Sequence, residues 1–256
     1  MKKIFALVLS ILMVMSMFAG CGKAGSDNEL NLVKEGKLIM STNAAFPPYE
    51  MTDDKGNFIG IDVEVAQAIA DKLGLELVID NMEFTAALEA AQKGKSDMVM
   101  AGVTVDPDRE MVMDFSNSYA KGVQVVIVPE NSEMKSIDDL DGKKIGTQMG
   151  TTGYIYCSDD YGEENVVAYD NGITAVQALL NGQIDCIVID NAPAQAFVKE
   201  NAGLKILDTE YAVEDYAIGF KKGNTALKDA VNEALAELIK DGTIQKIVDK
   251  YIPAEQ

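Results

Sequence analysis

The fold is decided by the stretch Met98-Val99-Met100-Ala101-Gly102-Val103-Thr104-Val105-Asp106-Pro107-Asp108-Arg109. It begins as a short apolar run, which is typical of a buried strand. Gly102 then leaves the backbone bare for a ligand, and Asp106-Pro107 starts a helix with an N-cap carboxylate and a proline at the first helical position. With the hydroxyl of Thr104 and the guanidinium of Arg109, the helix N-terminus forms a cradle for a carboxylate. The alternative is an ordinary strand-turn-helix with a surface arginine.

Composition excludes several classes of function. The chain has 256 residues, enough for one large domain or two small ones, and it contains no histidine. Histidine-dependent hydrolases and imidazole zinc sites are therefore excluded, and no spacing suggests another metal site or a cofactor. The formal net charge of −19 argues against nucleic acid or anionic lipid as a partner. Cys157 and Cys186 either pair or remain as two buried thiols.

The N-terminus is not expected to belong to the fold. Lys2-Lys3 is followed by the apolar run 4–17, which predicts a signal peptide over residues 1–20. Phe18-Ala19-Gly20-Cys21 resembles the lipobox of bacterial lipoproteins, in which the cysteine becomes the lipid-bearing N-terminus. Residues 21–36 would then be the lipidated Cys21 and a flexible tether. The alternative is plain secretion with an unmodified cysteine.

Strand and helix patterns alternate through the rest of the chain. Residues 38–41 and 75–79 are apolar-rich, as in strands, whereas 62–73 and 85–93 have helical spacing. We expect Asp62 to be the N-cap of the first of these helices and Gly74 to end it. Such alternation predicts βαβ units and a largely parallel sheet. Two amphipathic helices follow near the C-terminus, at 224–240 and 243–251.

The second half of the chain repeats the first. Gly94-Lys95-Ser96-Asp97 and Gly182-Gln183-Ile184-Asp185 each follow an amphipathic helix and precede a buried strand. Two such units suggest two lobes, and the alignment sets Asp190 at the position of Gly102, at the carboxyl end of its strand. Arg109 and Asp190 would then offer opposite charges to one small zwitterion. The alternative for Asp190 is an N-cap of the helix 192–200.

An ordered set of motifs carries a family resemblance over residues 38–252. Its members are Phe46-Pro47-Pro48-Tyr49-Glu50, Gly60-Ile61-Asp62-Val63-Glu64, Ala101-Gly102-Val103-Thr104 with Arg109, Asp114-Phe115-Ser116, Leu140-Asp141-Gly142-Lys143-Lys144, Gly150-Thr151-Thr152 and Val188-Ile189-Asp190. The chain resembles the polar amino acid-binding proteins of ABC importers, which are extracellular solute-binding proteins of family 3. The resemblance implies an α/β, two-lobe periplasmic-binding-protein-like fold, in which each lobe is a mixed, mostly parallel sheet flanked by helices. Two crossover strands would join lobe 1, residues 37–121 plus 214–256, to lobe 2, residues 122–213.

The resemblance also implies the ligand contacts. Arg109 would bind the α-carboxylate bidentately, helped by Thr152, while Thr104 and the Gly102 backbone would share the carboxylate and ammonium. Asp190 would pair with the α-ammonium. Further positions would contact the ligand's side chain: the stacking rings Phe46 and Phe84, and Asn43, Gln148 and Glu214 at the far end. The expected ligand is arginine, lysine or another cationic amino acid, with glutamine next.

The predicted function is therefore that of a binding protein. We expect a monomeric extracytoplasmic lipoprotein, anchored to the cell membrane or periplasmic, that delivers an amino acid to ABC transporter permease subunits and needs no cofactor. The alternative is a secreted enzyme on the same fold, similar to cyclohexadienyl or prephenate dehydratases, with Glu50 or Glu214 as its general acid or base. A sensor built on this fold is a third interpretation.

Overall fold

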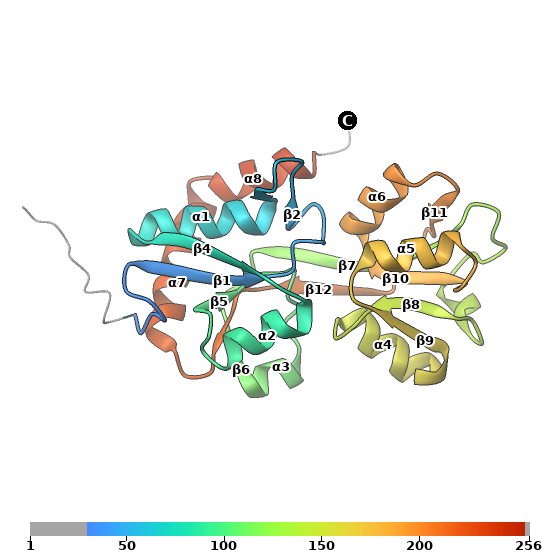
Figure 1. Cartoon of the computed structure of the whole chain (residues 1–256), viewed down its shortest axis with the longest axis horizontal. Coiled ribbons are helices and arrows are strands. Elements are labelled where there is room, and N and C mark those ends of the chain that lie inside the picture. Colours follow the sequence, from blue (N-terminus) through green and yellow to red (C-terminus); the bar gives the residue numbers. More distant parts are fainter. Residues whose placement is uncertain (1–29, 254–256) are drawn as a thin grey trace, which may run out of the picture.

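The structure is a computed structural model that describes residues 30–253. The expected signal peptide and the expected lipidation site Cys21 lie outside these residues. Within 30–253, no helix combines the length and apolar character needed to cross a membrane. The described residues form two α/β lobes that lie side by side, and two strands run between them (Figure 1).

The first lobe is built on a five-stranded sheet of order β4-β1-β5-β13-β6. Its strands are β1 (Lys37–Thr42), β4 (Glu76–Asn81), β5 (Met98–Val99), β6 (Met113–Phe115) and β13 (Gly219–Lys221). Its helices are α1 (Ile61–Leu73), α2 (Phe84–Gln92), α3 (Pro107–Val112), α7 (Thr225–Lys240) and α8 (Thr243–Tyr251). A small hairpin, β2 (Met51–Thr52) and β3 (Phe58–Ile59), lies outside the sheet. As the helical spacing predicts, α7 buries one apolar stripe, formed by Leu227, Val231, Leu235 and Leu238.

The second lobe has the sheet order β11-β7-β10-β8-β9, with β12 also paired to β7. Its strands are β7 (Ala120–Pro129), β8 (Ile145–Gln148), β9 (Val166–Tyr169), β10 (Cys186–Asp190), β11 (Leu204–Ile206) and β12 (Ala212–Tyr216). Three helices pack against this sheet: α4 (Thr152–Tyr161), α5 (Gly172–Leu180) and α6 (Asn191–Glu200). Short 3₁₀ turns lie at Ile137–Leu140 and Glu163–Asn165. The antiparallel pair β7 and β12, in which Gly122 faces Glu214, connects the two lobes (Figure 1).

Both sheets are mixed, as expected, but they are less parallel than the alternating pattern predicts. Strand β1 is parallel to β4 and β5, and β8 is parallel to β9 and β10. Strand β13 is antiparallel to both neighbours, and β7 is antiparallel to β10, β11 and β12. The chain crosses between the lobes twice. The strands that follow the two crossings, β7 and β13, run antiparallel to their neighbours in each sheet. "Mostly parallel" is therefore wrong for these sheets, since antiparallel pairings equal or outnumber the parallel ones.

The internal repeat has the same structural role in each lobe. The carboxylate of Asp97 accepts backbone N–H bonds from Val33 and Ile39, both at 2.7 Å, and Asp185 accepts one from Lys144 at 2.8 Å. Each aspartate thus fixes its loop to the start of the adjacent parallel strand. The strands that follow, β5 and β10, lead to Gly102 and to Asp190.

Asp62 does not cap α1, and that prediction is wrong. The helix begins at Ile61 after Gly60, and no side chain caps it. The carboxylate of Asp62 is fully buried and instead accepts the Gly102 N–H at 3.0 Å and the Tyr119 hydroxyl at 2.7 Å. These long-range donors hold the bare backbone at the end of β5 against α1.

The two described cysteines are free thiols, which is the second of the alternatives above. Cys157 on α4 and Cys186 on β10 are fully buried in one apolar cluster of the second lobe. Burial raises the pKa of both thiols to about 12, so neither is a reactive thiolate at neutral pH.

Candidate ligand-binding site

A small cavity lies between the lobes. Nine of the ten predicted contact residues line it: Asn43, Phe46, Phe84, Gly102, Thr104, Arg109, Gln148, Thr152 and Asp190. They come from both lobes and from sequence positions as far apart as 43 and 190. Convergent polar groups in one inter-lobe cavity are the usual form of a small-molecule site.

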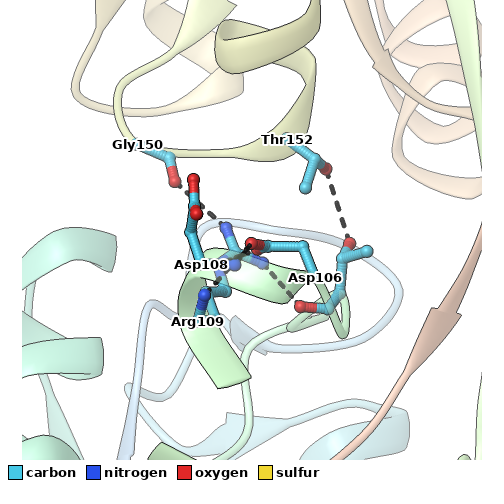
Figure 2. Close-up of polar contacts among 6 residues, drawn as sticks. Asp106, Asp108, Arg109, Gly150 and Thr152 are labelled. Atoms are coloured by element: carbon cyan, nitrogen blue, oxygen red, sulfur yellow. Dashed lines mark hydrogen bonds and ion pairs between the residues drawn. The ribbon is translucent and has the colours of Figure 1, made fainter. Parts of the chain in front are cut away.

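Arg109, the only arginine in the sequence, is buried in the wall of this cavity. Asp106 caps α3 by accepting the N–H groups of Asp108 and Arg109, which places the guanidinium in the first turn as predicted. Its Nε lies 3.1 Å from Asp106 Oδ2, and its Nη1 donates to Thr104 O at 2.8 Å (Figure 2). Nη2 reaches the other lobe and donates to Gly150 O at 3.1 Å. The two hydrogen bonds use one N–H group on each terminal nitrogen and leave the second on each, the fork that matches a carboxylate.

Two further contacts join the lobes across the cavity. Thr104 Oγ1 lies 3.4 Å from Thr152 Oγ1, which opens α4 (Figure 2). Gln148 Nε2 donates to Asn43 Oδ1 at 3.0 Å. The lobes are therefore closed on each other, with the cavity between the Thr104–Thr152 contact and the amide pair.

Asp190 occupies the N-cap position of α6, but its carboxylate does not cap the helix. One oxygen accepts from Gln124 Nε2 at 2.9 Å and the other from the Tyr216 hydroxyl. Burial, with a smaller contribution from the charge of Glu214, raises the pKa of Asp190 to about 7. The carboxylate lines the cavity and would ionise more readily beside a cation.

Gly102 brings the aromatic wall close to the backbone. Its φ of +56° favours glycine, and a Cβ there would lie 2.9 Å from Phe46 Cε1.

The other aromatic ring of the cavity wall contacts the arginine: the Phe84 ring centroid lies 5.6 Å from Arg109 Cζ. Phe84 therefore supports the guanidinium through a cation–π contact as well as lining the cavity.

Glu214 is the predicted contact residue that is not in the cavity wall. It is buried in β12 and accepts from Gln124 Nε2 at 2.9 Å. Because Glu214 is buried, it is not a solvated surface charge. Glu214 and Asp190 thus accept from the same Gln124 nitrogen.

Three lining residues were not predicted as contacts: Glu50, Ala101 and Thr151. Glu50 is fully buried, and burial together with Asp62 raises the pKa of its carboxyl well above the ordinary value. The turn that carries it closes through the Phe46 N–H, which donates to Glu50 O at 2.9 Å. The Pro-Pro-Tyr-Glu motif was the only sequence feature that pointed to Glu50, and no spacing rule predicts that this turn folds back to the cavity. Ala101 and Thr151 simply adjoin predicted residues.

Comparisons with known proteins show which chains this one is similar to. The sequence profile of the Bacterial extracellular solute-binding proteins, family 3, matches residues 38–254. The chain is 30% identical over 266 residues to the "Arginine-binding extracellular protein ArtP" of Bacillus subtilis (strain 168), with 100% of both chains covered. It is also similar to "An ancestral arginine-binding protein bound to arginine", with 40% identity, a TM-score of 0.80 and coverage of 85% of this chain and 99% of that one. Its similarity to "An ancestral arginine-binding protein bound to glutamine" has 39% identity and a TM-score of 0.81, with coverage of 86% of this chain and 99% of that one.

Proposed function

The chain belongs to family 3 of the bacterial extracellular solute-binding proteins, and we propose that it captures a cationic or amide amino acid for an ABC importer. The observation that carries this proposal is the placement of Arg109 and Asp190 on opposite lobes around one closed cavity. The relatives above are binding proteins, so the dehydratase alternative is set aside.

The backbone end of the ligand would lie between these two charges. The two remaining N–H groups of Arg109 would bind the α-carboxylate, together with the Thr152 hydroxyl at the N-terminus of α4. Asp190 would take the α-ammonium, with Thr104 and Gly102 beside it. Arg109 and Thr104 belong to the first lobe whereas Thr152 and Asp190 belong to the second, so a bound amino acid would hold the lobes closed.

The side-chain end favours a hydrogen-bond donor. Asn43 Nδ2 donates to Met82 O at 2.8 Å, and Gln148 Nε2 donates to Asn43 Oδ1. Both NH₂ groups are thus directed at protein acceptors, and the Gln148 carbonyl oxygen is the group suited to meet a ligand. Among the described residues that line the cavity, Arg109 is the only cation. These features favour a guanidinium, ammonium or amide over a side-chain carboxylate, and the rings of Phe46 and Phe84 suit its alkyl stem.

The proposal extends to the rest of the chain. We assign residues 37–121 plus 214–256 to one lobe and 122–213 to the other, which the two sheets support. Permease subunits would receive the ligand from a monomer held at the membrane by a lipid on Cys21 or free in a periplasm. The Phe18-Ala19-Gly20-Cys21 segment supports the anchor.

A thermal-shift screen against the twenty L-amino acids tests the proposal. A ligand present at about 100 times its Kd stabilises the folded state by about 2.7 kcal/mol, so binding is readily seen. Arginine, lysine or glutamine should give the largest rise in melting temperature, and Arg109→Ala or Asp190→Ala should abolish it. Lys222→Ala is the matched control, because that cation contacts Asp114 outside the cavity. No rise with any amino acid, together with turnover of a prephenate-like acid, would support the enzyme instead.

A further inference from the structure

Each of the two strands that join the lobes donates one hydrogen bond to Asp190. Gln124 on β7 reaches Oδ2, and the Tyr216 hydroxyl on β12 reaches Oδ1. Gln124 is the register partner of Asp190 within the second lobe's sheet. The donor on β12 is the last residue of that strand, which also forms a bridge with Thr104 of the first lobe.

The backbone of Tyr216 is bound to the first lobe. It forms a bridge with Thr104, and its carbonyl accepts the Tyr119 N–H at 3.0 Å. Its ring is fully buried and packs edge-on against Tyr49, with centroids 5.2 Å apart. Tyr216 ends β12, one of the two strands that join the lobes (Figure 1), and its hydroxyl donates to Asp190 Oδ1.

Gly122 makes room for this contact. An added Cβ would lie 2.6 Å from Asp190 Oδ1 and 2.6 Å from two ring atoms of Tyr216. The φ of Gly122 is not in the left-handed region, so the backbone itself would accept another residue. Space for the Tyr216–Asp190 pair is what requires a glycine here.

We propose that Tyr216 is a positioning residue for ligand binding, which holds the Asp190 carboxylate toward the cavity from the end of the crossover strand β12. The proposal rests on the proposed function, in which Asp190 binds the α-ammonium. A carboxylate oxygen that accepts one O–H retains a second lone pair for the ligand. Fixing the carboxylate before the ligand arrives removes an ordering cost from binding.

The charges around Asp190 give this role a distinctive signature. The Tyr216 hydrogen bond lowers the pKa of Asp190 and so opposes the effect of burial. The other titratable and charged groups that face Asp190 from neighbouring elements are Glu214, Glu50, Tyr49 and Arg109. Because only ionised Asp190 pairs with an ammonium, affinity should fall as pH drops through its pKa. Without the hydroxyl that pKa rises, and the loss of affinity begins at a higher pH.

The test is calorimetric titration of the protein with L-arginine and with L-glutamine, from acid to alkaline pH, for wild type and Tyr216→Phe. The variant keeps the ring and should bind about tenfold more weakly, with its pH midpoint moved upward. Gly122→Ala, which keeps the hydroxyl but separates the pair, should show both changes. Tyr161→Phe is the matched control: its hydroxyl donates to Ile137 O at 3.1 Å outside the cavity, so affinity and midpoint should stay at wild-type values.

The outcomes separate the two proposals. If wild type binds and Tyr216→Phe or Gly122→Ala keeps both the wild-type affinity and the wild-type midpoint, the role of Tyr216 is refuted and the proposed function stands. A uniform loss of affinity with no change in midpoint also refutes it, because a general structural defect would act that way. If wild type binds neither amino acid, the proposed function fails and the role of Tyr216 fails with it.

Discussion

Replacing Arg109 with lysine isolates the geometry of the guanidinium from its charge. In the structure this side chain makes three contacts with the protein, to Asp106, Thr104 O and Gly150 O. Lysine has a single nitrogen with three N–H groups and cannot both keep these contacts and offer a two-point fork to a carboxylate. The variant should keep the cavity's positive charge and lose bidentate recognition.

The expected loss follows from the bonds removed. Each hydrogen bond to a charged group contributes about 1.5–3 kcal/mol, and the ammonium of lysine can retain one of the two. Arg109→Lys should therefore weaken amino-acid binding by about 1.5–3 kcal/mol, or about 10- to 150-fold in Kd. Its contact with Gly150 crosses the lobes, so the closed form should also be less favoured.

Isothermal titration with the best ligand of the screen and with its α-carboxamide measures this loss. The carboxamide lacks the carboxylate, so wild type and Arg109→Lys should bind it with similar, low affinity. The difference between the two ligands then reports the contact between Arg109 and the carboxylate alone. Wild-type affinity of Arg109→Lys for the amino acid would refute the assignment. An equal loss for both ligands would place the carboxylate elsewhere in the cavity.

Three further changes test other parts of the site. The pKa of Asp190 is raised from 3.8 to about 7, so the folded state loses stability as pH rises through that interval and is least favoured when the buried carboxyl is ionised. At alkaline pH Asp190→Asn should therefore raise the melting temperature of the ligand-free protein and also weaken binding. A lower melting temperature would contradict this. Gly102→Ala should lower the free energy of unfolding, measured by urea denaturation, by about 1–3 kcal/mol more than Gly74→Ala does. Both glycines have a positive φ, but only a Cβ at Gly102 would clash, with the Phe46 ring. Equal losses would exclude that clash. Asn43→Asp adds a negative charge at the far end and should raise the ratio of arginine to glutamine affinity about tenfold; an unchanged ratio in titrations would place the ligand's side chain elsewhere.

Local pattern was sufficient where one element decides the outcome. The Asp106-Pro107 start of α3 and the apolar stripe of α7 occur in the structure as predicted. The repeat also led to Asp190, because two βαβ units of similar sequence bring strand ends to corresponding places. The resemblance supplied the remaining predicted contact positions, and all of these except Glu214 line the cavity.

Local pattern failed where a side chain's partner is remote. Asp62 has the sequence of a helix cap, yet its carboxylate binds Gly102 and Tyr119, 40 and 57 residues away. Glu50 follows Tyr49 and Glu214 lies two residues before Tyr216, yet only the packing of the turn and of the crossover strands decides that Glu50 lines the cavity. Such partners come from remote segments, and no spacing rule says which donor lies near a buried carboxylate.

The sequence by itself determined the alternating elements, the two repeated units, the helix that presents Arg109 and the absence of imidazole chemistry, since these depend on periodicity, capping and composition. Only the tertiary structure decided that Arg109 of one lobe meets Gly150 of the other, that Asp190 is held by Gln124 and Tyr216, and that Cys157 and Cys186 are free thiols. The physical reason is that these contacts join segments separated by many residues. Their distances depend on how two crossover strands set one lobe against the other, which is a property of the packed chain rather than of any local stretch.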